Sequence, residues 1–122
     1  DWIKLAKIAS KALNDNNVKG VIITHGTDFL HYTASALSFM LQDINKPVVL
    51  TYSQRSTDRG SSDASLNLLC AAQAALSDIA EVMLVGHASI NDNYCYALSG
   101  TNRCYGSYPS GIGHRPGDGI GV

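Results

Sequence analysis

Two short polar segments hold the residue types that could do chemistry. The first is Thr-His-Gly-Thr-Asp at residues 24–28, and the second is Ser-Gln-Arg-Ser-Thr-Asp-Arg at residues 53–59. In the first, the Thr27 hydroxyl stands beside the Asp28 carboxylate and follows Gly26, which allows close backbone approach; this arrangement suits acyl transfer or hydrogen bonding to a substrate. A threonine is a poor nucleophile until a base takes its proton, so catalysis would require a nearby lysine or histidine.

The first segment also has a purely structural explanation. Thr27 or Asp28 could simply cap the helix that follows. His25 and His31 could supply the base, or they could serve only as structural hydrogen-bonding groups. Spacing alone leaves the catalytic and structural explanations open.

The second segment is similarly ambiguous. Arg55 and Arg59 could recognise a carboxylate through an arginine fork, or they could form salt bridges with Asp58 and Asp63 that fix the next helix. Ser62 or Asp63 is expected to cap that helix.

Metal and disulfide chemistry are not predicted. No cluster of histidine, cysteine and carboxylate residues has metal-ligand spacing, so we expect no metal site. Cys70, Cys95 and Cys104 make an odd number without a Cys-x-x-Cys pair, which argues against a disulfide framework and a zinc site. We therefore expect reduced thiols, with Cys70 as a small buried hydrophobic residue.

Hydrophobic periodicity predicts the elements that position the two segments. Helical spacing predicts helices over residues 2–13, 31–42 and about 62–77, and short apolar runs predict strands over residues 18–24, 47–52 and 82–85. This alternation predicts an α/β fold: a parallel, doubly wound sheet in three layers. Because ligands bind at the carboxyl ends of the strands in such sheets, both polar segments are expected at one edge.

The composition excludes several classes of protein. Nine Lys+Arg against ten Asp+Glu give a formal net charge of -1. The chain therefore lacks the excess positive charge expected for direct nucleic-acid binding. No run approaches the roughly 20 apolar residues that span a bilayer. The start has neither a signal peptide nor a methionine, so we expect a chain without membrane contact, cut from a longer protein. The expected reduced thiols indicate that it is cytoplasmic. Because six of eleven glycines lie in residues 102–122, we expect one domain over residues 1–101 and an irregular Gly-rich tail of unassigned origin.

The motifs IITHGTD (residues 22–28) and SQRSTDRGSSDA (residues 53–64) resemble the asparaginase/glutaminase family, and within it the D subunits of archaeal glutamyl-tRNA(Gln) amidotransferases. HGTD marks the whole family, whereas QRSTDR is more similar to the amidotransferase subunits than to free-standing asparaginases. The similarity runs almost from residue 1 to about Thr101. It implies that residues 1–101 are a partial asparaginase-like N-terminal domain.

This resemblance implies an amidohydrolase, a glutaminase that removes the side-chain amide of glutamine through a threonine nucleophile and an acyl-enzyme. The ammonia would pass to a tRNA-binding partner subunit, which amidates tRNA-bound glutamate. Thr27 and Asp28 match the family's second catalytic threonine and its neighbouring aspartate, Gly26 would lie beside the substrate, and Ser53 is a candidate for the pocket wall. The resemblance also implies a homodimer and no cofactor for amide hydrolysis, since ATP and Mg would belong to the partner subunit.

Two departures from the family pattern affect the expected activity. The family's first threonine, in a Gly-Gly-Thr motif, would lie upstream of Asp1, and the family's lysine should follow Thr101, whereas this chain has no lysine after Lys46. We therefore expect the 122-residue chain to be inactive alone. The alternatives are a stand-alone cytoplasmic L-asparaginase that acts on asparagine and a degenerate, non-catalytic binding module.

Overall fold

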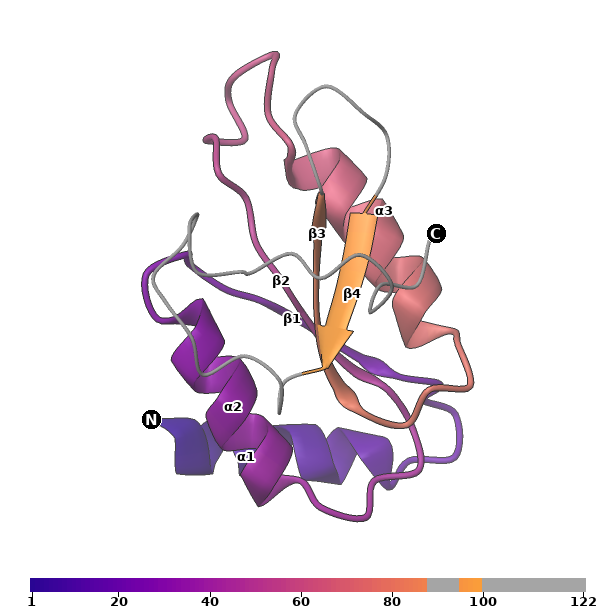
Figure 1. Ribbon diagram of the computed structural model, residues 1–122. Helices are drawn as coiled ribbons and strands as arrows, with labels where there is room; N and C mark the ends of the chain where they lie inside the picture. Colours follow the sequence, from indigo (N-terminus) through magenta and orange to yellow (C-terminus); the bar gives the residue numbers. More distant parts are fainter. Residues whose placement is uncertain (88–94, 100–122) are drawn as a thin grey trace.

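Helices and strands alternate along the chain in the computed structural model, which describes residues 1–87 and 95–99. The elements are α1 (Trp2–Leu13), β1 (Val21–Thr24), α2 (Leu30–Met40), β2 (Val48–Thr51), α3 (Ala64–Ala75), β3 (Val82–His87) and β4 (Cys95–Ser99). The strands form one sheet in the order β1-β2-β3-β4, in which β1, β2 and β3 are parallel and β4 is antiparallel to β3 (Figure 1). The predicted α/β fold is confirmed, and β4 is an additional strand that the periodicity did not indicate.

Helices cover both faces of the sheet and so make three layers. Val48 and Leu50 of β2 pack in one cluster with residues of α1 and α2, whereas Val49 packs in a second cluster with residues of α3. All four residues of β2 are buried, as expected for a central parallel strand with both faces covered. The hydrophobic core therefore holds β2 rigidly, and the polar loop that follows it begins from a fixed point.

The first helix lies where its pattern predicts it. Asp1 caps α1, since its carboxylate accepts hydrogen bonds from Ile3 N and Lys4 N. At the other end, Lys46 Nζ donates to Leu13 O and to Asp15 O, each at 2.7 Å. A lysine is favourable at this position because the carbonyls at a helix C-terminus carry partial negative charge. Lys46 thereby ties the segment before β2 to the end of α1.

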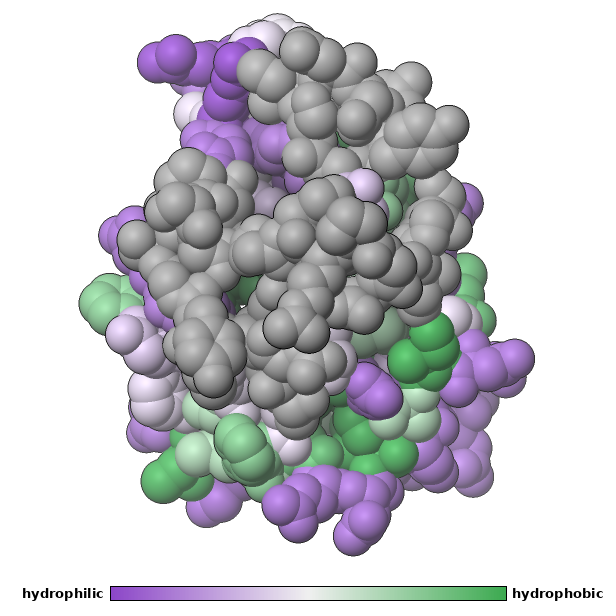
Figure 2. All heavy atoms as spheres, viewed as in Figure 1, coloured by the Kyte–Doolittle hydropathy of each residue, from purple (hydrophilic) through white to green (hydrophobic). Residues whose placement is uncertain are grey.

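The loop between β2 and α3 is the longest polar connection among the described residues. Residues 54–61 are all exposed, and hydrophilic residues gather at the top left of Figure 2, where Figure 1 places this loop. Asp63 is the N-cap residue of α3, as one of the two predicted candidates, but its side chain makes no capping hydrogen bond. Its carboxylate instead turns toward the start of the loop.

The expectation of reduced thiols is wrong for two of the cysteines. Cys70 of α3 and Cys95 of β4 form a disulfide, with their Cα atoms 6.3 Å apart. Both residues are buried, as predicted for Cys70. Cysteine counting missed this pair because the two residues are 25 positions apart and meet only once β4 pairs with β3 beside α3. Cys104 lies outside the described residues.

Within residues 1–87 and 95–99, no helix is long and apolar enough to cross a membrane. In the same part of the chain, no group of three or more histidine, cysteine or acidic residues could hold a metal ion. The predicted tail, residues 102–122, lies outside the described residues.

Candidate functional site

The two polar segments leave neighbouring strands at the same edge of the sheet. β1 and β2 are paired through Thr24 and Thr51 at their carboxyl ends, and His25 N extends the ladder by donating to Thr51 O at 2.9 Å. Adjacent strands lie about 5 Å apart. The HGTD segment and Ser53 therefore begin side by side, as the order of elements predicted.

The residues of the HGTD segment are accessible from solvent. Gly26 and Asp28 are exposed, and Thr27 is half-buried. A Cβ atom placed on Gly26 would meet no described atom within 4 Å, so there is space beside this glycine. Phe29 is the N-cap residue of α2; because Thr27 and Asp28 precede the cap, the explanation that either one merely caps the helix is wrong.

His25 fixes the backbone of the HGTD segment. Its Nδ1 lies 2.6 Å from Gly26 O and its Nε2 lies 3.0 Å from Thr33 Oγ1. A carbonyl only accepts, so Nδ1 carries the proton and, in the neutral ring, Nε2 accepts from the threonine hydroxyl. That hydroxyl in turn accepts from Trp2 Nε1 at 3.0 Å. With both ring nitrogens engaged, His25 has the structural role that its position left open.

His31 takes no part in this arrangement. Its ring packs against the ring of Tyr32 in the first turn of α2, with centroids 4.1 Å apart and the planes tilted by 37°. No hydrogen bond joins His31 to Thr27 among the described residues. Neither histidine is thus placed as the base that Thr27 would need.

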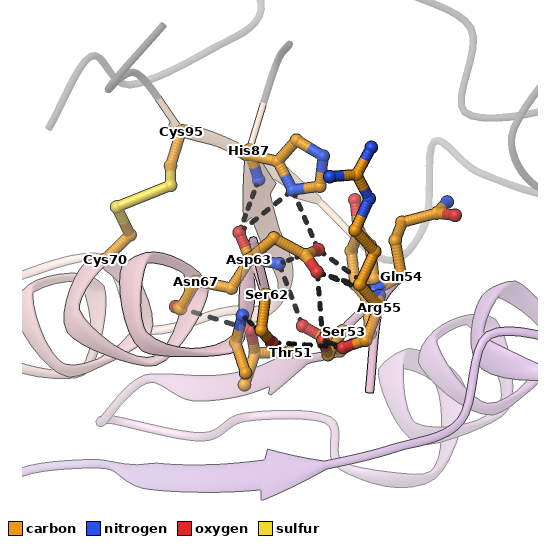
Figure 3. Close-up of polar contacts among 12 residues, drawn as sticks. Thr51, Ser53, Gln54, Arg55, Ser62, Asp63, Asn67, Cys70, His87 and Cys95 are labelled. Atoms are coloured by element: carbon orange, nitrogen blue, oxygen red, sulfur yellow. Dashed lines mark hydrogen bonds and ion pairs between the residues drawn. A yellow bond between two sulfur atoms is a disulfide. The ribbon is translucent and has the colours of Figure 1, made fainter. Parts of the chain in front are cut away.

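The Asp63 carboxylate holds the turn that follows β2. It accepts hydrogen bonds from Ser53 Oγ at 2.9 Å, from Gln54 N at 2.9 Å and from Arg55 N at 3.0 Å (Figure 3). Burial of the carboxylate raises its pKa, but the hydrogen bonds from Gln54 N, Arg55 N and Ser53 Oγ outweigh burial, so the pKa of Asp63 lies below its ordinary value. Asp63 is therefore held as a carboxylate at neutral pH.

Two further residues hold Asp63 from the opposite side. Asn67 Nδ2 donates to Asp63 Oδ2 at 3.0 Å, and His87 Nδ1 lies 3.2 Å from the same oxygen. His87 N donates to Asn67 Oδ1 at 2.8 Å, and Asn67 Nδ2 also donates to Tyr52 O at 2.9 Å. We call Asp63, Asn67 and His87 the Asp63 clamp. It connects the turn after β2 to α3 and to the end of β3.

The salt-bridge explanation for this loop is wrong. Within residues 1–87 and 95–99, neither Arg55 nor Arg59 forms an ion pair with Asp58 or Asp63, and the loop is held by hydrogen bonds instead. His87 was missed because the predicted third strand stopped at Val85, whereas β3 continues to His87. One signal in the sequence could have identified His87. It follows the apolar run of the third parallel strand, whose carboxyl end lies at the same sheet edge as the two polar segments.

The comparisons with known proteins identify the family of the chain. The family model described as "Asparaginase, N-terminal" matches residues 1–103. The D subunit of the glutamyl-tRNA(Gln) amidotransferase of Thermococcus kodakarensis is 58% identical over 100 residues, which cover 82% of this chain and 22% of that protein. The corresponding D subunit of Pyrococcus furiosus is 57% identical over 100 residues, which cover 82% and 23%.

Solved structures give the same fold. The thermostable L-asparaginase from Thermococcus kodakarensis has a TM-score of 0.71 at 34% identity, over 83% of this chain and 28% of that one. L-asparaginase I from Vibrio cholerae has a TM-score of 0.70 at 32% identity, over 99% and 32%. The chain thus spans less than a quarter of the length of the two amidotransferase relatives. Because the family model covers residues 1–103 and the fold agrees, the chain belongs to the asparaginase family, as part of its N-terminal domain.

Proposed function

We propose that the protein containing this chain is the glutaminase subunit of a tRNA-dependent amidotransferase. The observation that carries the proposal is the meeting of the HGTD segment and Ser53 at one sheet edge, in a chain 57 to 58% identical to two amidotransferase D subunits. Glutamine would lie beside Gly26, with Asp28 holding its α-amino group and Ser53 on the pocket wall. A threonine hydroxyl would attack the side-chain amide carbon, forming an acyl-enzyme and releasing ammonia.

Several groups that this reaction needs are not supplied by the described residues. Thr27 matches the second threonine of the family's catalytic set by resemblance, and among the described residues the ring contacts of His25 and His31 are with other groups. The chain also has no lysine after Lys46. We therefore propose that the 122-residue chain is inactive alone and that the remainder of the site comes from further parts of the protein or from a second copy.

A stand-alone L-asparaginase is the second candidate, and the two solved asparaginase structures favour it. Their identities of 34 and 32% are well below those of the two D subunits. The QRSTDR loop, which resembles the D subunits, also favours the amidotransferase glutaminase. The glutaminase assignment is therefore the better supported of the two, and it implies a tRNA-binding partner subunit that takes up the ammonia.

Ammonia release by the full-length protein tests these assignments. The protein is incubated with glutamine or asparagine, with and without the partner subunit loaded with glutamyl-tRNA(Gln). The proposal predicts glutamine hydrolysis that increases with the loaded partner. Equal or faster hydrolysis of asparagine, unaffected by the partner, would establish the asparaginase instead, and no hydrolysis of either amide would establish a non-catalytic module.

A further inference from the structure

We propose that Asp63 is a positioning residue that sets where the pocket wall stands relative to Thr27. This inference rests on the proposed amide hydrolysis and adds residues that the HGTD motif does not contain. Asp63 lies ten positions after Ser53 and, within the described part of the chain, its carboxylate oxygens bond to the turn and the clamp residues named above. It therefore acts through Ser53 and does not depend on contact with the substrate.

The turn after β2 depends on the carboxylate for its shape. Ser53, Gln54 and Arg55 lie beyond the last ladder pair, Thr24 with Thr51, so the sheet does not fix them. The backbone N–H groups of Gln54 and Arg55 instead converge on the two oxygens of Asp63, and the Ser53 hydroxyl is shared between Asp63 Oδ1 and Arg55 O. A carboxylate offers acceptors on both oxygens, whereas an asparagine would turn an NH₂ group toward one set of these donors.

The clamp is anchored in the rigid part of the molecule. Asn67 has no solvent exposure, and the side chains of His87 and Asp63 are only 7% and 9% exposed. His87 is the last residue of β3 and Asn67 lies in the first turns of α3. The position of the turn is thus set by two packed elements that neither bear Thr27 nor contain Ser53 (Figure 3).

The two sides of the site, the HGTD segment and the turn at Ser53, are held by different residues. His25 and Thr33 hold the HGTD side, and the Asp63 clamp holds the Ser53 side. A misplacement of about 1 Å in the groups that position a substrate can cost about 100-fold in rate. Loss of the clamp should therefore move the pocket wall while the hydroxyl of Thr27 stays in place.

The test is glutamine hydrolysis by the full-length protein bearing Asp63→Asn. Its matched control is Asp58→Asn, which removes the same charge from an exposed position of the same loop. We expect Asp63→Asn to raise KM for glutamine about 10-fold or more and to lower kcat/KM by about 10- to 100-fold, and the control to stay within twofold of wild type. A purely structural defect would reduce the active fraction, and so kcat, with KM unchanged.

Two further variants complete the experiment. His87→Gln keeps the Asp63 carboxylate but removes the imidazole that contacts Asp63 Oδ2 and Asn67 Oδ1, and it should raise KM about threefold or more, even where Asp63→Asn does not fold. Combined with Asp63→Asn, it should add nothing, because His87 acts through Asp63. Wild-type KM in His87→Gln, or in folded Asp63→Asn, with an active wild-type enzyme, would overturn the positioning role alone. A wild-type enzyme without activity would overturn the proposed function and this inference with it.

Discussion

Replacement of Asn67 by alanine should destabilise the fold more than any other single amide truncation on α3. The Asn67 side chain is fully buried and donates to the backbone carbonyl of Tyr52 and to the Asp63 carboxylate, while accepting from the backbone N–H of His87. Alanine offers none of these groups. The variant therefore removes the link between β2, β3 and the first turns of α3.

The magnitude follows from the groups that lose their bonds. A buried polar group deprived of its partner costs about 1–3 kcal/mol, and two backbone groups, Tyr52 O and His87 N, lose the amide here. The predicted loss of unfolding free energy is therefore about 2–6 kcal/mol. Asn67→Asp keeps the size of the side chain but places a second carboxylate against Asp63, so it should be destabilising too, which separates hydrogen bonding from volume.

Equilibrium urea unfolding of the 122-residue chain measures this effect. The midpoint should fall for both Asn67 variants without a change in the denaturant slope. Gln73→Ala is the matched control, because Gln73 is an exposed amide on the same helix and its truncation should stay within about 0.5 kcal/mol of wild type. A loss below about 1 kcal/mol in Asn67→Ala, at equal slope, would refute the account of the buried network.

Three more predictions concern single positions. Lys46→Met removes the charged group that caps the end of α1 and should cost about 1 kcal/mol in urea unfolding, whereas Lys19→Met, at an exposed lysine, should cost little; equal effects would contradict the cap. Gly20→Ala should lower the urea unfolding midpoint, because the added Cβ would clash with the backbone of α3. Gly60→Ala should leave the midpoint unchanged, because a Cβ there meets no described atom within 4 Å. An unchanged midpoint in Gly20→Ala would contradict the predicted clash. Because the pKa of the Asp63 carboxyl is lower in the folded state, its ionised form stabilises the fold above about pH 4, and this stabilisation is lost as pH falls through the folded-state pKa. Urea unfolding midpoints measured between pH 7 and 3 should therefore decline more steeply for wild type than for Asp63→Asn. Parallel curves would contradict the lowered pKa of Asp63.

The fold followed from the sequence because each element has a strong local pattern. The apolar face of residues 2–13 and the β-branched run before Thr24 each predict one element, and their order leaves few parallel topologies. β4 had no such signal, since Cys95–Ser99 is a short strand whose burial comes from pairing with β3. The disulfide between Cys70 and Cys95 was missed for the same reason, because the two residues meet only in the folded chain.

The candidate site was predictable only in its exposed half. Thr27 and Asp28 form a motif of adjacent residues, whereas the groups that hold the turn at Ser53 come from the start of α3 and the end of β3. Asp63 sits at a helix start, where an aspartate is expected as a cap, and that expectation concealed its role. His87 gives no local signal in the sequence, because only the fold brings its backbone N–H and its ring to Asn67.

Steady-state glutamine hydrolysis by the full-length protein, with Thr27 replaced in two ways, tests the central claim most directly. Thr27→Val removes the hydroxyl at constant shape, and Thr27→Ser retains it. If the HGTD segment is part of an amide-hydrolysing site, Thr27→Val should lose at least about 1,000-fold in kcat and Thr27→Ser should keep measurable turnover. Wild-type turnover in Thr27→Val would contradict the claim that this sheet edge hydrolyses amides.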